Sequence, residues 1–337
     1  MPKVQHVPLH PIGKSFWGRL KIRRIMIEKE EFYFGSRDGE HKLHAVKWRP
    51  ETEKPICILQ IVHGMSEHIG RYEEFARFMA GKGILVVGDD HLGHGLSVKE
   101  GEIRGYFCKE DAATVLVRDE HRLKKMMQEQ YPGIPYIILG HSMGSFILRN
   151  YLTRYGNGID GAIIMGTGMQ PKRAVRLGWL QASFLSAVLG SKYVCKGMDK
   201  ALFGVYNRKF QAGPEDSGHW VSVNPENVKA FQSDPLCDFV FTANGFQTLM
   251  RLILNLYDEE KLAQMPKNLP VLFVSGQDDP VGDFGKSVEK VFRSFETLGM
   301  EYVQLKLYPG DRHEILNEAD RQDVYGDIYR FVLQNVT

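Results

Sequence analysis

The stretch that decides the fold reads PYIILGHSMGSFILRNYL and runs from Pro135 to Leu152. An apolar run leads into Gly-His-Ser-Met-Gly, and a second apolar run with a different period follows it. A strand that enters Gly-x-Ser-x-Gly and continues as a helix is typical of a nucleophile elbow, in which a strained turn exposes the serine hydroxyl. A chance match in a loop is the alternative, and the strand-to-helix context disfavours it. We therefore predict that Ser142 is a catalytic nucleophile.

The rest of the chain alternates short apolar runs with helical patterns. The apolar runs end in Gly, Asp or His, and they read ICILQIVHG, ILVVGDD, YIILGHS, AIIMGTG, VLFVSGQDD and VQLKLYPGD. A hairpin over 31–48 that turns at Asp38-Gly39 precedes them. This order predicts an α/β fold with a mostly parallel sheet flanked by helices on both faces. In such sheets the functional residues gather at the carboxyl ends of the strands.

One connection is longer than an ordinary crossover. Roughly 100 residues of helical character separate AIIMGTG from VLFVSGQDD, and they contain no convincing strand. We predict that residues 169–245 form an inserted helical cap, and that residues 29–168 and 246–337 form the core. Residues 1–28 are predicted to be a separate basic and aromatic segment.

Composition excludes several classes of protein. The 337 residues carry a formal net charge of +2, so there is no basic field of the kind that nucleic-acid binding requires. Four cysteines lack C-x-x-C spacing and indicate neither a zinc site nor a disulfide framework. No apolar stretch approaches the roughly 20 residues of a membrane-spanning helix. We expect a cytoplasmic protein.

The N-terminal segment contains GKSFWGRLKIRRIMI, in which aromatic and aliphatic residues alternate with five cations. This pattern is compatible with peripheral contact with an anionic membrane. The alternative is a segment packed on the core with its cations in water.

A serine nucleophile needs a base and an orienting acid, which follow it in the order Ser, acid, His in this type of fold. Asp278 and Asp279 end one predicted strand, and His313 lies just beyond the next. We prefer Asp279 as the acid and His313 as the general base. The oxyanion needs two donors. The elbow supplies the backbone N–H of Met143, and the loop HGMSEHIGRY supplies that of Met65.

These residues bring out a resemblance to the α/β-hydrolase fold. Within that fold the sequence resembles the monoacylglycerol lipase and lysophospholipase group, which overlaps the serine aminopeptidase S33 family. The similar stretches are HGMSEHIGRY (63–72), DHLGHGLS (90–97), YPGIPYIILGHSMG (131–144) and SDPL (233–236). The resemblance implies the same triad and oxyanion donors, and no cofactor. It is weak in the cap, and Ser145 stands where these lipases usually have a further glycine.

Several other residues have two interpretations. Asp89, Asp90, His91 and His94 resemble metal ligands, but we favour a tight turn that lines the pocket, and we expect no metal. Candidate substrate contacts lie in the loop after the first parallel strand and in the cap; they are His63, Glu67, Arg71, Trp179 and Phe184. His63 can instead belong to an ordinary turn, and Glu67 and Arg71 can pair with each other to hold the loop. The apolar cap residues can line an acyl channel or form the cap's own core.

The sequence thus predicts a serine hydrolase that cleaves carboxylic esters of lipid-like substrates, a monoacylglycerol or a lysophospholipid. Alternatives that use the same triad are a small-ester or amide carboxylesterase and an aminopeptidase. A catalytically silent binding module is a further alternative, which the complete Ser-Asp-His set disfavours.

Overall fold

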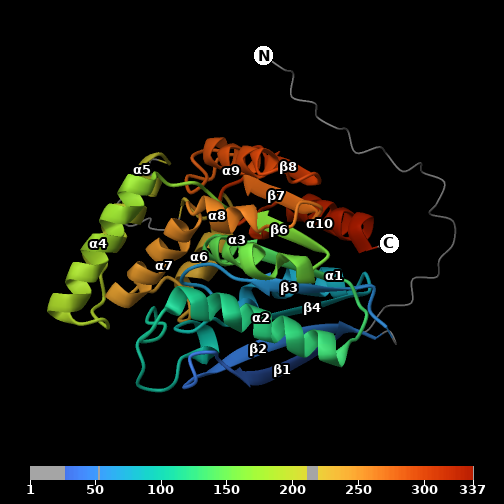
Figure 1. The fold of residues 1–337 in the computed structure, drawn as a ribbon, viewed down its shortest axis with the longest axis horizontal. Helices are drawn as coiled ribbons and strands as arrows, with labels where there is room; N and C mark the ends of the chain where they lie inside the picture. The colour runs from blue at the N-terminus through green and yellow to red at the C-terminus, as the bar shows by residue number, and fades with distance from the viewer. Residues whose placement is uncertain (1–26, 52–53, 211–218, 337) are drawn as a thin grey trace, which may run out of the picture.

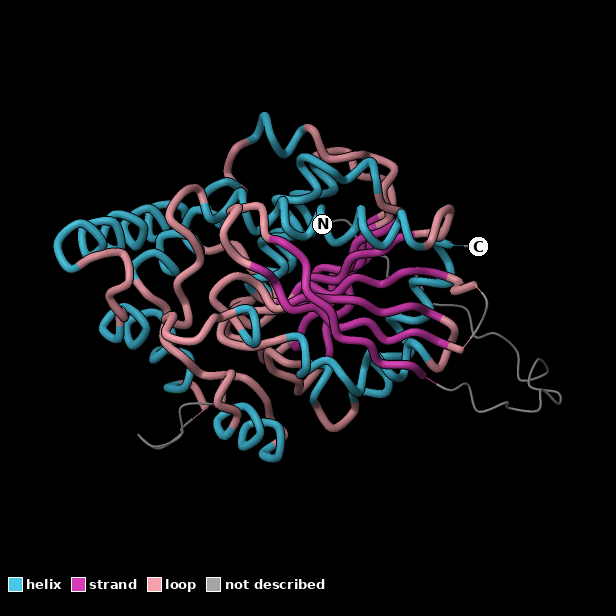
Figure 2. The backbone as a smooth tube through the Cα atoms, turned by 90° about the horizontal axis from the view of Figure 1, so that it is seen from below, coloured by secondary structure: helices cyan, strands magenta, loops and turns pink. Residues whose placement is uncertain are grey.

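An eight-stranded sheet crosses the middle of the molecule, with helices on both of its faces (Figures 1 and 2). The structure is a computed structural model that describes residues 27–51, 54–210 and 219–336. The strand order is β1-β2-β4-β3-β5-β6-β7-β8; the first two pairs are antiparallel and all the others are parallel. The strands are β1 (Ile27–Gly35), β2 (Lys42–Pro50), β3 (Cys57–Val62), β4 (Ile84–Asp89), β5 (Tyr136–His141), β6 (Gly161–Met165), β7 (Val271–Gly276) and β8 (Val303–Tyr308). This architecture confirms the predicted α/β-hydrolase fold.

The helices divide between the two faces of the sheet. They are α1 (Glu73–Ala80), α2 (Ala112–Gln130), α3 (Met143–Tyr155), α4 (Lys172–Leu189), α5 (Lys196–Arg208), α6 (Pro225–Ser233), α7 (Ala243–Asn255), α8 (Glu259–Ala263), α9 (Lys286–Thr297) and α10 (Arg321–Val336), with short 3-10 turns η1 (Ile69–Tyr72), η2 (Gly95–Ser97), η3 (Gly156–Gly158) and η4 (Ile315–Asn317). One core contains apolar residues of α2, α3, α7 and α9, and the other contains those of α1 and α10. Alternate residues of the central strands enter the two cores, so both faces of the sheet are buried.

The predicted hairpin is present as β1 and β2. Gly39 in its turn has φ of 82°, a conformation that glycine adopts without strain. β1 begins at Ile27, which pairs with Pro50, so the strand starts slightly before the predicted end of the N-terminal segment. The rest of that segment lies outside the described residues, and its membrane contact stays a prediction.

The long connection between β6 and β7 contains α4, α5, α6, α7 and α8 in its described part, and α4 and α5 extend beyond one end of the sheet (Figure 1). α7 contacts α2, α3 and α4, so it joins this region to the core as the predicted crossover helix would. The division into core and cap stays a prediction. None of the helices within the described ranges is both long and apolar enough to cross a bilayer.

Candidate active site

Ser142 lies in a strained turn between β5 and α3. Its φ of 52° and ψ of −117° are unusual for a residue with a side chain. The flanking glycines allow neighbouring backbone to approach closely. A Cβ on Gly144 would lie 2.0 Å from the Val62 carbonyl oxygen, and one on Gly140 would lie 2.5 Å from the Gly144 carbonyl oxygen. Only glycine fits at either position, and this explains why the chain places a serine between two glycines here.

Hydrogen bonds fix the turn to the neighbouring strand. The Ser142 N–H donates to the carbonyl of Met165 at the end of β6, at 3.0 Å. The hydroxyl of Ser145 donates to the Ser142 carbonyl at 2.6 Å and lies 2.9 Å from the Thr167 hydroxyl. Ser145 is fully buried, so the residue that departs from the lipase pattern contributes a hydrogen bond that holds the elbow.

His313 and Asp279 form a buried pair. Asp279 follows β7 and His313 follows β8, and the His313 Nδ1 lies 2.8 Å from Asp279 Oδ2. Asp279 Oδ1 also accepts a hydrogen bond from the Val281 N–H at 2.8 Å. Asp278 is exposed. Because the carboxylate accepts from Nδ1, the Nε2 atom of His313 is the one available to take a proton.

The elbow and the His313 loop meet through the residue before the serine. The His141 and His313 ring centroids are 4.7 Å apart. A Cβ on Gly166 would lie 3.1 Å from the His141 ring and 3.2 Å from His313 Cε1, so both rings press against this glycine. Within the described part of the chain, neither the Ser142 hydroxyl nor His313 Nε2 has a hydrogen-bond partner. Hydrogen bonds between catalytic groups are often long in ligand-free enzymes and tighten when substrate binds.

The loop after β3 passes directly beside Ser142. A Cβ on Gly64 would lie 3.1 Å from the Ser142 Cβ, so the next residue, Met65, is near the serine. Among the described residues no acceptor takes the Met65 N–H. Met143 is the first residue of α3, where an N–H has no partner within the helix. Among the described residues, the two backbone donors that the sequence predicts therefore have no acceptor.

His63 is buried and cannot contact a substrate in this structure. Its Nδ1 lies 2.8 Å from the Gly64 carbonyl, and its Nε2 accepts a hydrogen bond from the His91 N–H at 3.0 Å. Desolvation and the neighbouring histidines lower the pKa of His63 well below its ordinary value, so the ring is neutral. This histidine holds the loop that carries Met65.

Glu67 is buried and has partners within the protein. It accepts hydrogen bonds from the Gly64 N–H, the Tyr72 hydroxyl (2.9 Å) and His141 Nδ1 (3.0 Å). Burial would raise the pKa of Glu67, but the His141 hydrogen bond and the nearby Arg71 outweigh it and lower that pKa to about 2. These contacts favour a structural role over a substrate contact.

Arg71 connects the core to α6. Its guanidinium donates to Glu314 and, at 3.0 Å, to the Asn227 side-chain oxygen, and it lies 4.9 Å from the Phe231 ring centroid. Asn227 in turn donates to Glu314 at 2.7 Å. Arg71 therefore also has a structural environment, and it ties part of the predicted cap to the loop that carries His313.

Trp179 and Phe184 both lie on α4 but have different surroundings. Trp179 is partly buried beneath Arg251, whose guanidinium is 4.7 Å from its ring. Phe184 is 66% exposed and belongs to a row of outward apolar side chains with helical spacing. The row, which we call the α4 stripe, is Leu177 (67% exposed), Leu180 (51%), Phe184 and Val188 (61%). The α4 stripe does not form the cap's own core.

Trp220 is a site residue that the sequence did not reveal. It lies between α5 and α6, and its ring is 5.1 Å from the His313 ring. Trp220 also stacks with Phe203 at 6.2 Å, so the predicted cap contributes an aromatic cover to the proposed base. Only the three-dimensional packing could identify it, because its sequence neighbours carry no motif.

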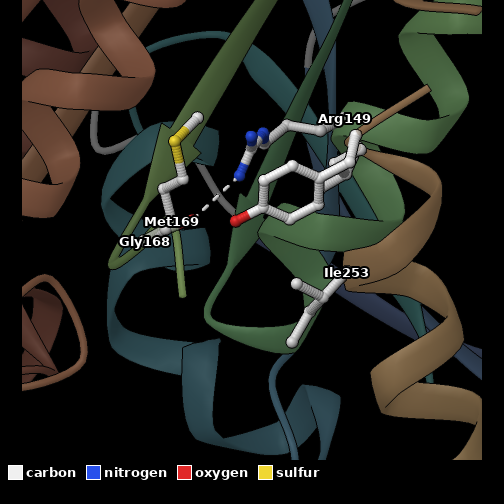
Figure 3. Close-up of a pocket in the computed structure, with 6 residues that line it drawn as sticks. Arg149, Gly168, Met169 and Ile253 are labelled. Carbon is white, nitrogen blue, oxygen red and sulfur yellow. Dashed lines mark hydrogen bonds between the residues drawn. The ribbon is translucent and has the colours of Figure 1, made fainter. Parts of the chain in front are cut away.

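Two small cavities lie close to the site but are not lined by Ser142, Asp279 or His313. One lies behind α3 and contains the buried Arg149, which donates to the Gly168 carbonyl at 3.0 Å (Figure 3). Burial lowers the pKa of Arg149 to about 10. The other is lined by Glu67, Tyr72, His141, Met165, Glu314, Leu316 and Asn317. Neither cavity is an acyl channel that leads to the serine.

Comparisons with known proteins show what this chain is similar to. Residues 53–320 match the family model described as serine aminopeptidase, S33. A monoacylglycerol lipase of Mycolicibacterium smegmatis is 28% identical over 86% of this chain and 92% of its own length. A human monoglyceride lipase is 28% identical over 88% of both chains. The crystal structure of a thermostable carboxyl esterase from Bacillus coagulans in complex with glycerol is 29% identical, with a TM-score of 0.84 over 93% of this chain and 100% of that one.

Proposed function

Because the chain belongs to the serine aminopeptidase S33 family and is a hydrolase with the α/β-hydrolase fold, we propose that it cleaves carboxylic esters of lipid-like substrates through an acyl-enzyme on Ser142. The substrate class that we propose is a monoacylglycerol or a lysophospholipid. The observation that carries the proposal is the buried hydrogen bond between Asp279 and His313, at the same sheet edge as the strained Ser142 turn.

The proposed chemistry assigns one role to each group. His313 Nε2 removes the proton from the Ser142 hydroxyl as its oxygen attacks the ester carbonyl. Asp279 holds the Nδ1–H tautomer and stabilises the imidazolium that forms. The backbone N–H groups of Met65 and Met143 donate to the oxyanion. His313 then protonates the departing alcohol, and a water molecule that His313 deprotonates releases the acid from Ser142.

Two observations favour a lipid-like substrate. The Mycolicibacterium smegmatis and human relatives are named monoacylglycerol and monoglyceride lipases. The α4 stripe exposes apolar surface on the predicted cap, and such patches commonly contact a lipid surface or another protein. This surface would contact a bilayer that contains the substrate.

A series of monoacyl glycerol esters from acetyl to long-chain acyl tests the proposed substrate class. Each methylene that enters an apolar channel contributes at most about 0.8 kcal/mol, so a few carbons should raise kcat/KM about tenfold or more until the channel ends. A profile that peaks at acetyl contradicts the lipid assignment and favours a small-ester carboxylesterase. Cleavage of amino-acyl arylamides with little ester hydrolysis favours an aminopeptidase. A folded protein that turns over none of these substrates favours a binding module.

A further inference from the structure

A second cluster of ionisable side chains lies behind the proposed active site, on the α2 side of the sheet. Asp89 is the last residue of β4, His91 follows it by two positions, and Glu120 projects from α2. The three side chains are at most 1% exposed, and one ligand-type atom from each lies within 4.8 Å of the others. The reaction proposed above uses none of them.

The atoms that face the centre of this cluster have no hydrogen-bond partners. Both Asp89 carboxylate oxygens, His91 Nδ1 and Glu120 Oε1 are buried and unpartnered. The other Glu120 oxygen is satisfied, because Gln60 Nε2 donates to it at 2.6 Å. Buried carboxylates that lack hydrogen bonds are costly, so this cluster requires a positive charge, which is either a proton on His91 Nδ1 or a bound cation.

The contacts of the two His91 ring nitrogens determine the protonation state of the ring. His91 Nε2 lies 3.0 Å from the backbone carbonyl oxygen of His63, which can only accept, so Nε2 carries the hydrogen. Nδ1 lies 3.2 Å from Glu120 Oε1 and 3.8 Å from Asp89 Oδ2, so without an ion the ring also carries a proton on Nδ1 and is an imidazolium. A divalent ion bound between the three side chains would replace this Nδ1 proton, and it would also reach the two Asp89 oxygens, which one N–H cannot satisfy.

We propose that Asp89, His91 and Glu120 bind a divalent metal ion, with zinc as the best fit. Zinc ligands about 2.0 Å from the ion lie about 3.3 Å apart in a tetrahedron, and the separation of His91 Nδ1 from Glu120 Oε1 is close to this value. Two carboxylates and a neutral imidazole balance the charge of the ion. A fully buried site disfavours magnesium, which keeps several of its water ligands.

The surroundings of the cluster resemble the outer shell of a metal site. A histidine that binds a metal commonly donates its other N–H to a backbone carbonyl, as His91 does to His63. Gln60 supports Glu120, and the Tyr136 hydroxyl donates to Gln60 Oε1 at 2.5 Å. These contacts hold both side chains in place without contributing charge to the centre.

The proposed ligand set differs from Asp89, Asp90, His91 and His94, which from the sequence alone we interpret as a tight turn without a metal. Asp90 accepts hydrogen bonds from His44 Nδ1 and from the Ile69 and Leu96 N–H groups, at 2.8–2.9 Å. His94 Nε2 accepts from the Ser66 N–H at 3.2 Å. Asp90 and His94 are therefore already occupied, and the third ligand comes from α2.

The site has a structural consequence for the loop that carries Met65. His91 contacts His63 twice, through its Nε2 to the carbonyl oxygen and through its backbone N–H to His63 Nε2. An ion bound to His91 would therefore fix the residue two positions before Met65. This effect on the loop rests on the proposed function, whereas the binding of the metal does not.

Metal analysis of the full chain tests the site independently of activity. The protein is purified without metal-affinity chromatography, stripped with a chelator, and titrated with zinc in competition with a chromophoric chelator. We expect one zinc per chain, and at least tenfold weaker binding in Glu120→Gln and in Asp89→Asn. Cys237→Ser is the matched control, since His68, Asp234 and Cys237 form the other group of potential ligands in the described part.

Three outcomes would overturn the proposal. The first is that the wild-type protein takes up no zinc. The second is that Glu120→Gln binds zinc as tightly as wild type, and the third is that Cys237→Ser abolishes zinc binding. Should the ligand variants fail to fold, cobalt titration of the stripped wild-type protein decides the question. Four donor atoms, which are both Asp89 oxygens, Glu120 Oε1 and His91 Nδ1, predict four-coordinate cobalt absorption bands without a thiolate charge-transfer band. An octahedral spectrum or a thiolate band contradicts it.

Discussion

His141 donates its Nε2–H to the backbone carbonyl of His313, 3.3 Å away, while its Nδ1 faces Glu67 at 3.0 Å. Both ring nitrogens face acceptors, so His141 is an imidazolium that pairs with Glu67. Burial disfavours this cation, but the hydrogen bond and the charge of Glu67 prevail and raise the pKa of His141. One ion pair thus connects the oxyanion loop, the elbow and the loop of the proposed base.

This ion pair predicts a pH-dependent contribution to stability. The pKa of Glu67 is lowered, so its contribution is present above its ordinary pKa of 4.5 and is lost as the pH falls toward about 2. The pKa of His141 is raised, so its contribution is present below its ordinary pKa of 6.5 and is lost as the pH rises through the raised value. Glu67→Gln should therefore lower the free energy of unfolding by about 3 kcal/mol, chiefly between these two ordinary values.

Urea unfolding of wild type and Glu67→Gln at a series of pH values measures this difference. Glu74→Gln is the control, because Glu74 pairs with Arg321 on the surface and should contribute less than about 1 kcal/mol. A deficit in Glu67→Gln that is equally large at pH 3, 6 and 9 would contradict the assignment of an ion pair.

Ser142→Ala should abolish ester hydrolysis and labelling by a fluorophosphonate probe. Loss of the nucleophile typically costs several orders of magnitude in kcat. The variant should remain folded, because the main-chain bonds of the turn do not use the hydroxyl, and circular dichroism checks this. Turnover close to wild type in the purified variant would refute the proposed nucleophile.

Asp279→Asn should be far more harmful than Asp278→Asn. An amide at position 279 favours the wrong tautomer of His313, and the equivalent change in a serine protease costs about 10⁴-fold in kcat. Asp278 is exposed and therefore provides a matched control with the same chemical change. Steady-state kinetics on one ester substrate compares the two variants, and the opposite ranking would exchange their roles.

The α4 stripe should contribute to activity on membrane-borne substrate only. Leu177→Ser with Val188→Ser should lower activity on vesicle-borne monoacylglycerol by about tenfold or more, because each side chain would lose about 1 kcal/mol of burial in lipid. Activity on a soluble short ester should not change. Tyr302→Ser is the control, since Tyr302 is 57% exposed and precedes β8 at the opposite end of the strand from His313. Equal losses on both substrates would place the stripe in packing or substrate binding.

The sequence could predict the elbow and the His313 loop because local patterns and chain order determine them. Gly140 and Gly144 are required by close backbone contacts within and next to the turn, so they leave a readable motif. Chain order alone does not distinguish Asp279 from Asp278. In the structure Asp279 is buried and Asp278 is exposed.

Most partners of the buried charges could not be predicted. The sequence suggests that Glu67 and Arg71 can pair, and Arg71 Nε lies 3.7 Å from Glu67 Oε2. Glu67 pairs with a histidine 74 positions away, and Arg71 with a glutamate 243 positions away, so only the packing of distant elements reveals them. The sequence shows Asp89 and His91 two positions apart, but nothing near them indicates that Glu120 lies beside them. The periodicity of the α4 stripe is also visible, although whether such a row is buried or exposed depends on its neighbours.

The order of Ser142 and His313 along the chain has a consequence for biosynthesis. Ser142 follows β5, whereas His313 follows β8, so β6, β7, β8 and the long connection are synthesised between them. A chain that emerges from the ribosome therefore displays the nucleophile before the base that would activate it has been synthesised. Under the proposed roles, chains that terminate before His313 are inert toward ester substrates.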